Sequence, residues 1–297
     1  TFTGRAGTVS IFGLLDDPGQ TLSINAARTW QVSTGTLRGI TVAGDTGALL
    51  QVTSSDGILH GVTLGVNTTL RQGAQVTVNN GLTLTNNVTL RLENFTVDTS
   101  SATNDTGLNF DGVAPVLAGT GSLELFRTID NNGGSDVADD DVRVRSLDDT
   151  LTIGSGITIR NATNSDLTSL GSTALPLLIE GTVSARSSGR TLRVNGLSVT
   201  STGTLTATSS GILQVTVTPT NFSGGTLTGG AWQAVSGGTL RVPLPSSVIT
   251  NAASVTLDGA TSNFYRDSGT TRALAELTTN TGSLTLRNGQ VLVTIAE

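Results

Sequence analysis

The stretch from Gly61 to Val97, GVTLGVNTTLRQGAQVTVNNGLTLTNNVTLRLENFTV, decides the expected fold of this chain. Apolar residues alternate with Thr in short runs such as VTL, VTV and LTL, and these runs recur every six or seven residues. Period-two alternation is typical of strands, and the Gly and Asn residues between the runs are typical of turns. Short strands at this spacing, three to each winding, predict a coil of about 20 residues, as in β-helical repeats.

The same pattern returns along much of the chain, for example in LTIGSGITI at 151–159 and GSLTLRNGQVLVTI at 282–295. The five-mer SGGTL occurs twice, at 223–227 and 236–240. We expect both copies to turn corners of a coil, with Leu227 and Leu240 in the core and Trp232 packed between them. The predicted fold is therefore all-β, a right-handed parallel β-helix (β-solenoid), and a single elongated domain over residues 1–297. An antiparallel sandwich is the alternative, but its turns fall every 8–12 residues.

Three segments break the rhythm. Residues 1–45 contain scattered aromatics and the turn DDPG, and we expect an irregular N-terminal cap there because open solenoid ends need covering. Residues 126–149 read as an acidic loop insertion. The third break is residues 262–280, within which RALAELTTN at 272–280 suggests a short helical turn. It lies inside residues 222–297, which form a C-terminal repeat-like segment.

Composition excludes several classes of function. The chain has 297 residues, 36% hydrophobic, 3% aromatic and 13% charged, with a formal net charge of −6. An acidic surface repels phosphate backbones, so we expect no nucleic-acid partner. Without lysine or cysteine, Schiff-base, P-loop and thiolate chemistry are excluded. The apolar runs are too short for a membrane span. Because methionine is absent, we do not expect Thr1 to be the translated start.

The acidic loop holds the sharpest metal candidate. Carboxylate oxygens suit Ca²⁺. A calcium site, the one possible cofactor, would use four neighbouring carboxylates: Asp136, Asp139, Asp140 and Asp141. The alternative is a solvated loop whose charge is partly offset by Arg143 and Arg145.

Catalytic candidates are few. Glycoside hydrolysis needs two carboxylates at a suitable separation, and Glu93, Glu124 and Glu180 lie in or beside strand patterns. His60, in GILHGVTL, is the only histidine, and alternation with inward Leu59 points it outward. One histidine and no cysteine make a zinc site untenable. We therefore expect isolated surface carboxylates and no enzyme activity.

The sequence of residues 222–295 resembles that of a known family. GGTLTGGAWQ, GGTLRV, TNAASVTLDGATSNF and ALAELTTNTGSLTLRNG resemble the repeat units of large bacterial β-strand-repeat surface proteins, which are similar to autotransporter passengers and filamentous-haemagglutinin-type adhesins. The resemblance implies a secreted or surface-displayed parallel β-helix with an adhesive or scaffolding role.

These observations lead to one expected function and two alternatives. The expectation is an extracellular structural protein, a subunit of a cell-surface fibre, matrix or adhesin that associates with itself through open solenoid ends. The alternatives are a polysaccharide lyase or hydrolase on the same solenoid, and a calcium-stabilised module that binds surface glycans.

Overall fold

The computed structural model describes residues 7–53, 57–95, 105–128, 142–269 and 271–294. These residues form strands and turns without a helix, and the strands pair with one another in ladders. Nearly all of the strand pairs among the described residues are parallel, as β1 with β4 and β22 with β25. The predicted parallel β-solenoid is therefore confirmed, and the antiparallel sandwich is wrong. Within the described part of the chain, no helix is long and apolar enough to cross a membrane.

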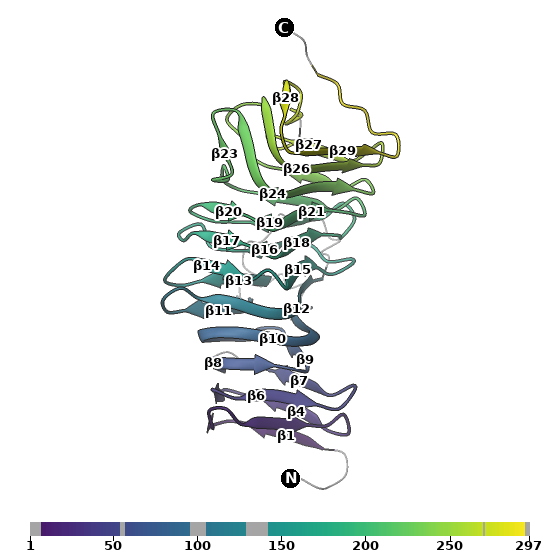
Figure 1. The fold of residues 1–297 in the computed structure, drawn as a ribbon. Coiled ribbons are helices and arrows are strands. Elements are labelled where there is room, and N and C mark those ends of the chain that lie inside the picture. Colours follow the sequence, from purple (N-terminus) through teal and green to yellow (C-terminus); the bar gives the residue numbers. More distant parts are fainter. Residues whose placement is uncertain (1–6, 54–56, 96–104, 129–141, 270, 295–297) are drawn as a thin grey trace. The chain divides into compact units, whose positions relative to one another are not determined.

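The chain divides into two compact units, Thr1–Ile157 and Thr158–Glu297. Figure 1 shows stacked strands in each unit. The strands of the first unit are β1 (Thr8–Ile11), β2 (Leu14–Asp16), β3 (Thr21–Ile24), β4 (Thr29–Val32), β5 (Thr36–Arg38), β6 (Thr41–Gly44), β7 (Leu49–Val52), β8 (Gly57–Leu64), β9 (Asn67–Leu70), β10 (Gln75–Asn94), β11 (Thr106–Asp111), β12 (Val116–Arg127), β13 (Val142–Ser146) and β14 (Leu151–Ile153).

The second unit continues the strand pattern. Its strands begin with β15 (Ile157–Asn161) and go on as β16 (Thr168–Leu170), β17 (Leu177–Ile179), β18 (Thr182–Ala185), β19 (Thr191–Val194), β20 (Val199–Ser201), β21 (Thr204–Ala207), β22 (Ile212–Val215), β23 (Phe222–Ser223), β24 (Thr226–Val235), β25 (Thr239–Arg241), β26 (Thr250–Asp258), β27 (Asn263–Tyr265), β28 (Thr279–Asn280) and β29 (Ser283–Arg287).

Three strands make one coil in the first unit. Strands β1, β2 and β3 pair with β4, β5 and β6 respectively, so each strand meets the strand one winding later. Trp30 pairs with Leu50, 20 residues on, and Leu37 pairs with Leu59, 22 residues on. The predicted coil length is confirmed for these windings. Later windings are longer, as between Val78 and Phe110, because a longer connection separates β10 from β11.

The core of each unit consists of apolar ladders. In the first unit, Leu37, Leu59, Val78 and Phe110 are successive register partners, and each is at most 1% exposed. Their chain neighbours point outward, since burial alternates along the strands. Burying one such side chain contributes about 1.5–3 kcal/mol, so the ladders supply the main stabilising term.

The second unit has a ladder that includes its only tryptophan. Leu205, Trp232 and Val255 are register partners and are fully buried. The Trp232 ring stacks on Phe264, and its Nε1 donates a hydrogen bond to the Gly229 carbonyl at 3.0 Å. The predicted role of Trp232 as a packing element is confirmed.

The two SGGTL copies fold differently. In the first copy, Phe222–Ser223 pairs antiparallel with Thr226–Leu227. Gly224 and Gly225 both have positive φ, 55° and 77°, as the two central residues of a type I′ hairpin require. The expectation that this copy turns an ordinary solenoid corner is therefore wrong, because the chain reverses direction here.

The second copy turns a corner as expected. Gly238 lies so close to the preceding winding that a Cβ atom would stand 2.1 Å from the Ala207 carbonyl oxygen. The strand that follows pairs in parallel with β22 and β27. Leu227 and Leu240 are 0% and 1% exposed, so the predicted burial of both is confirmed.

The segments that interrupt the sequence pattern have distinct structures. The described part of residues 1–45 lies in strands β1–β6 and their turns. Of the segment 126–149, the described flanks belong to β12 and β13. The expected helical turn at 272–280 is wrong. Residues 273–276 form a turn and residues 279–280 form β28. Ala273 and Leu274 are buried, so tertiary packing overrides the weak helix propensity.

Candidate functional site

The predicted calcium ligands Asp136, Asp139, Asp140 and Asp141 lie outside the described residues. The nearby Arg143, on β13, forms an ion pair with Asp105 at 2.8 Å. Arg145 donates from Nε to Asn109 Oδ1 at 2.9 Å. Over the ranges that the structure covers, no group of three or more His, Cys, Asp or Glu side chains could hold a metal ion.

Two of the three predicted carboxylates lie together in the first unit. Strand β10 carries Arg91 and Glu93, and β12 carries Glu124 as the register partner of Arg91. Parallel strands lie about 4.8 Å apart, so register alone brings these side chains into contact. Strands β10 and β12 end at Asn94 and Arg127, which are also register partners, so the two following connections leave the coil at the same corner.

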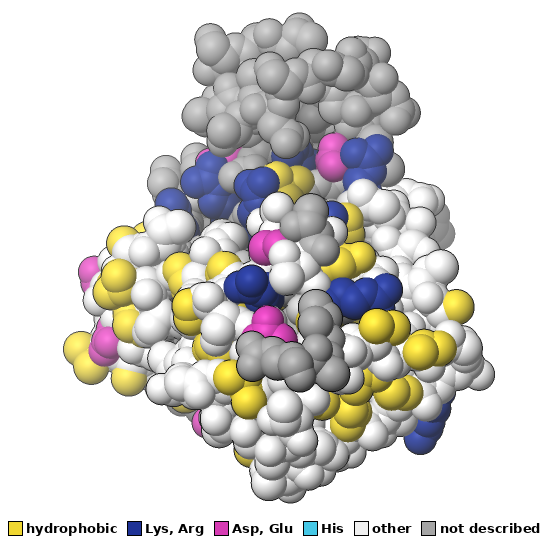
Figure 2. Space-filling model, turned by 90° about the horizontal axis from the view of Figure 1, so that it is seen from above, with side chains coloured by type: hydrophobic (Ala, Val, Ile, Leu, Met, Phe, Trp, Pro, Cys, Tyr) yellow, Lys and Arg dark blue, Asp and Glu magenta, His cyan; other side chains and the backbone are white. Residues whose placement is uncertain are grey.

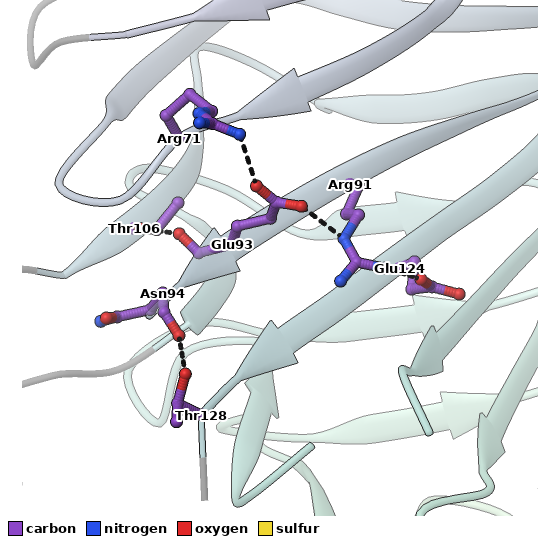
Figure 3. Close-up of polar contacts among 7 residues, drawn as sticks. All are labelled: Arg71, Arg91, Glu93, Asn94, Thr106, Glu124 and Thr128. Atoms are coloured by element: carbon purple, nitrogen blue, oxygen red, sulfur yellow. Dashed lines mark hydrogen bonds and ion pairs between the residues drawn. The ribbon is translucent and has the colours of Figure 1, made fainter. Parts of the chain in front are cut away.

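Arg91 joins the two carboxylates. Its Nε donates to Glu93 Oε1 at 2.7 Å, and one terminal nitrogen donates to Glu124 Oε1 (Figure 3). On the neighbouring winding, Arg71 donates to Glu93 Oε2 at 3.2 Å. The Arg91 guanidinium also stands 4.8 Å from the centre of the Phe126 ring, within cation–π range.

This ion-pair cluster occupies the space that a glycosidase would keep for substrate and water. Glu93 and Glu124 are each only 8% exposed, and the guanidinium of Arg91 lies between them. A buried carboxylate without a partner costs free energy. The Arg91 guanidinium supplies the opposite charge to both carboxylates. Glu180 belongs to the second unit, where it is exposed directly after β17. The arrangement therefore favours a structural role for these residues.

His60 lines a pocket of about 640 Å³ in the first unit. It points outward as predicted, half-buried beside the buried Leu59. The other lining residues are Asn79, Asn80, Gly81, Asp111, Gly112, Val113, Ala114, Pro115 and Val116. Sequence reasoning missed this pocket. The signal was present in the Asn-Asn-Gly and Asp-Gly turns at 79–81 and 111–112, but only the register shows that they are adjacent.

Asp111, which lines the pocket, is paired with the carboxyl group of Asp148. A hydrogen bond with Asp148, together with burial, raises the pKa of Asp111 above its ordinary value of 3.8. The same hydrogen bond and that from the Gly112 N–H lower the pKa of Asp148. The N–H groups of Ala114 and Thr150 lower the pKa of Asp149. These bonds fix the backbone of residues 112–114 at the rim of the pocket, since Ala114 N–H reaches Asp149 Oδ2 at 3.0 Å.

The first coil of the first unit is incompletely covered. Among the described residues, β1, β2 and β3 each pair on one side only, with β4, β5 and β6. The inward residues Val9 and Leu15 are half-buried, whereas their register partners Trp30 and Leu37 are 3% and 0% exposed. Phe12 and Leu14 are 69% and 64% exposed. This coil therefore presents both unpaired backbone groups and apolar side chains.

No family model, no curated protein and no solved structure matches the chain.

Proposed function

We propose that this chain is a structural β-solenoid protein that associates with copies of itself through its end coils and acts as an extracellular or cell-surface scaffold or adhesin subunit. The carrying observation is the first coil, where β1–β3 have strand partners on one side only among the residues that the structure describes, beside the exposed Phe12 and Leu14. An exposed strand edge of this kind is a template for pairing with another chain.

The last coil offers a second edge. Within the described residues β29 pairs with β26 alone, and its side chains are half-buried or exposed. Beyond it, Val291 and Val293 are 65% and 62% exposed. Hydrophobic side chains are visible among polar ones in the view toward these C-terminal strands (Figure 2). Parallel addition of the first coil of one copy to the last coil of another would continue the ladders of both.

The surface also suits a scaffold. Thr alternates with core residues along the strands and stays half-buried, so its β-branch favours the extended backbone while its hydroxyl remains accessible. Stacked like charges would repel at strand spacing, and the chain contains only 13% charged residues. The proposal includes no catalytic role, because Arg91 forms ion pairs with both Glu93 and Glu124, the two candidate carboxylates that lie close together.

Sedimentation velocity over a range of concentrations tests the assembly. We expect species larger than the 30.2 kDa monomer, growing with concentration. Leu14→Lys places a charge on the open edge and should shift the distribution to monomer. Leu197→Lys, at an equally exposed apolar residue (65%) of the second unit, is the matched control and should leave assembly unchanged. A wild-type chain that stays monomeric at the highest concentration overturns the proposal.

Protease accessibility on intact cells of the source organism tests the location. Cleavage of the chain without lysis is the expected result, and full protection until lysis contradicts a surface role.

A further inference from the structure

The pocket beside His60 is a polar groove built by register. Arg38 pairs with His60, His60 with Asn79, and Asn79 with Asp111, so outward side chains of successive windings form one column. Adjacent members of the column lie about 4.8 Å apart along the direction in which the strands stack. His60, Asn79 and Asp111 line the pocket, and Arg38 is outside it in an ion pair with Asp16.

The polar side chains of this groove are available to a ligand. Within the described part of the chain, His60, Asn79 and Asn80 make no hydrogen bond through their side chains. An amide presents two donors and one acceptor, and a neutral imidazole presents one of each. His60 and Asn79 are half-buried and Asn80 is exposed. Polar groups that lack protein partners are the few orienting groups that a binding site needs.

One wall of the groove is aliphatic and fixed in place. Val113 is 92% exposed and stands beside Ala114 and Val116 in the pocket lining. The backbone at this rim is tied down, because Gly112 and Ala114 donate to the carboxylates of Asp148 and Asp149 at 3.3 and 3.0 Å. An exposed valine on a backbone held in this way is a preorganised contact surface.

We propose that this groove binds a neutral glycan, whose hydroxyls would hydrogen-bond to His60, Asn79 and Asn80 while the C–H face of a sugar ring packs on Val113. A pyranose ring presents hydroxyls at its edge and apolar C–H groups on its face, which matches a polar floor beside an aliphatic wall. The column spacing is close to the length of one sugar ring, so neighbouring rings can meet neighbouring windings. This inference is independent of self-assembly.

The charges at the groove select against other ligands. Asp111 lines the groove and is hydrogen-bonded to Asp148, and these acidic groups repel carboxylate or sulfate groups, so an acidic polysaccharide is disfavoured. Phosphate backbones are disfavoured for the same reason. A metal ion lacks a sufficient ligand set, since the described residues contain no cluster of three or more acidic or histidine side chains.

Methyl NMR on the full chain provides the test. The probes are neutral hexasaccharides (cello-, xylo-, manno- and maltohexaose) and one acidic comparator, hexagalacturonate. We expect at least one neutral probe to shift the methyl signals of Val113 and Val116 in a saturable way while those of Val293 stay constant. If no neutral probe does so up to millimolar concentration, or if hexagalacturonate binds more tightly, the assignment is wrong.

A pair of variants locates the binding. Asn79→Leu removes the central amide of the column and should weaken the bound hexasaccharide about tenfold, equivalent to about 1.4 kcal/mol. Thr77→Leu, outward on the same strand but outside the groove, is the control and should bind as the wild type does. Both variants must keep the wild-type far-UV CD spectrum. Equal binding by Asn79→Leu and the wild type would place the glycan elsewhere and overturn the proposal.

Discussion

Trp232 and Phe264 form a parallel, offset stack in the second unit, with ring centroids 6.2 Å apart and planes only 7° from parallel. Phe264 is the register partner of Leu240, and Trp232 is that of Val255, so the stack joins two strands of different faces of the coil. Both rings are at most 3% exposed. The stack is therefore a central part of the core of this unit.

Trp232→Ala should lower the free energy of unfolding by about 3–5 kcal/mol, because it leaves a cavity in the core and removes the stack. Urea denaturation followed by far-UV CD measures the change. Leu197→Ala, at a residue that is 65% exposed, should stay within about 0.5 kcal/mol of the wild type. A double-mutant cycle with Phe264→Leu should show a coupling of about 0.5–1.5 kcal/mol. A Trp232→Ala chain as stable as the wild type would contradict the described core.

Gly238→Ala should destabilise the second unit by about 1–3 kcal/mol. The added Cβ would stand 2.1 Å from the Ala207 carbonyl oxygen, so the two windings must separate locally. Gly13→Ala is the control, because no atom lies within 4 Å of its added Cβ and its φ is not positive. Melting temperatures of the two variants provide the comparison. Equal melting temperatures would mean that the corner at Gly238 is wider than described.

Arg91→Ala should cost about 1.5–3 kcal/mol of unfolding free energy, because it leaves the nearly buried carboxylates of Glu93 and Glu124 without this donor. The cost is below that of a fully buried pair, since the Arg91 side chain is 31% exposed and is partly screened. Arg38→Ala breaks an ion pair whose side chains are 52% and 35% exposed and should cost at most about 1 kcal/mol. A larger loss for Arg38→Ala than for Arg91→Ala would refute this ranking.

The carboxyl groups around the pocket should titrate on opposite sides of 3.8, which NMR of the side-chain carboxyl carbons can follow. Asp111 should titrate above this value, because Asp148 raises its pKa. Asp149 should titrate below it, because N–H groups of Ala114 and Thr150 stabilise its ionised form. A lowered folded-state pKa means that the stability from Asp149 is present above 3.8 and is lost as the pH falls through the folded pKa. By the same linkage, the stability from the raised pKa of Asp111 is present below 3.8 and is lost as the pH rises through its folded pKa.

The Asp148→Asn variant tests whether Asp148 causes the raised pKa of Asp111. The variant removes a neighbouring charge and offers Asp111 an amide donor, so the Asp111 midpoint should fall. The Asp149 midpoint should stay where it is, since its donors are backbone groups. An Asp111 midpoint that does not move in this variant would rule out Asp148 as the cause.

The sequence predicted the coil and its core because both depend on local alternation. Leu227 and Leu240 are buried as the pattern required. The direction of the chain at Gly224-Gly225 was not predictable, because a pair of glycines specifies a tight turn without specifying which strand follows as a partner. Propensity also suggested a helical turn near Leu274, where packing against the last coil decides the structure.

The neighbours in the candidate sites are set by the number of residues in each winding, and the alternating pattern does not reveal that number. Arg91 meets Glu124 because the winding between them is 33 residues long rather than about 20. The same holds for His60 and Asn79, and for Asn79 and Asp111, whose windings differ in length. Inward and outward residues of a strand share one register, so a lengthened connection changes the partner of both. The new inward partner is again apolar, so the core can be predicted, while the identity of the outward neighbour depends on the length of the connection.

The short step between register partners has a consequence for how the chain folds. Leu37 and Leu59 meet across 22 residues, so a parallel sheet, which ordinarily requires distant segments to find one another, is built here from near neighbours in sequence. Any completed winding can serve as the template for the next, and growth can proceed in either direction from where it starts. The chain can therefore fold one winding at a time as it emerges end-first from a ribosome or a translocation pore.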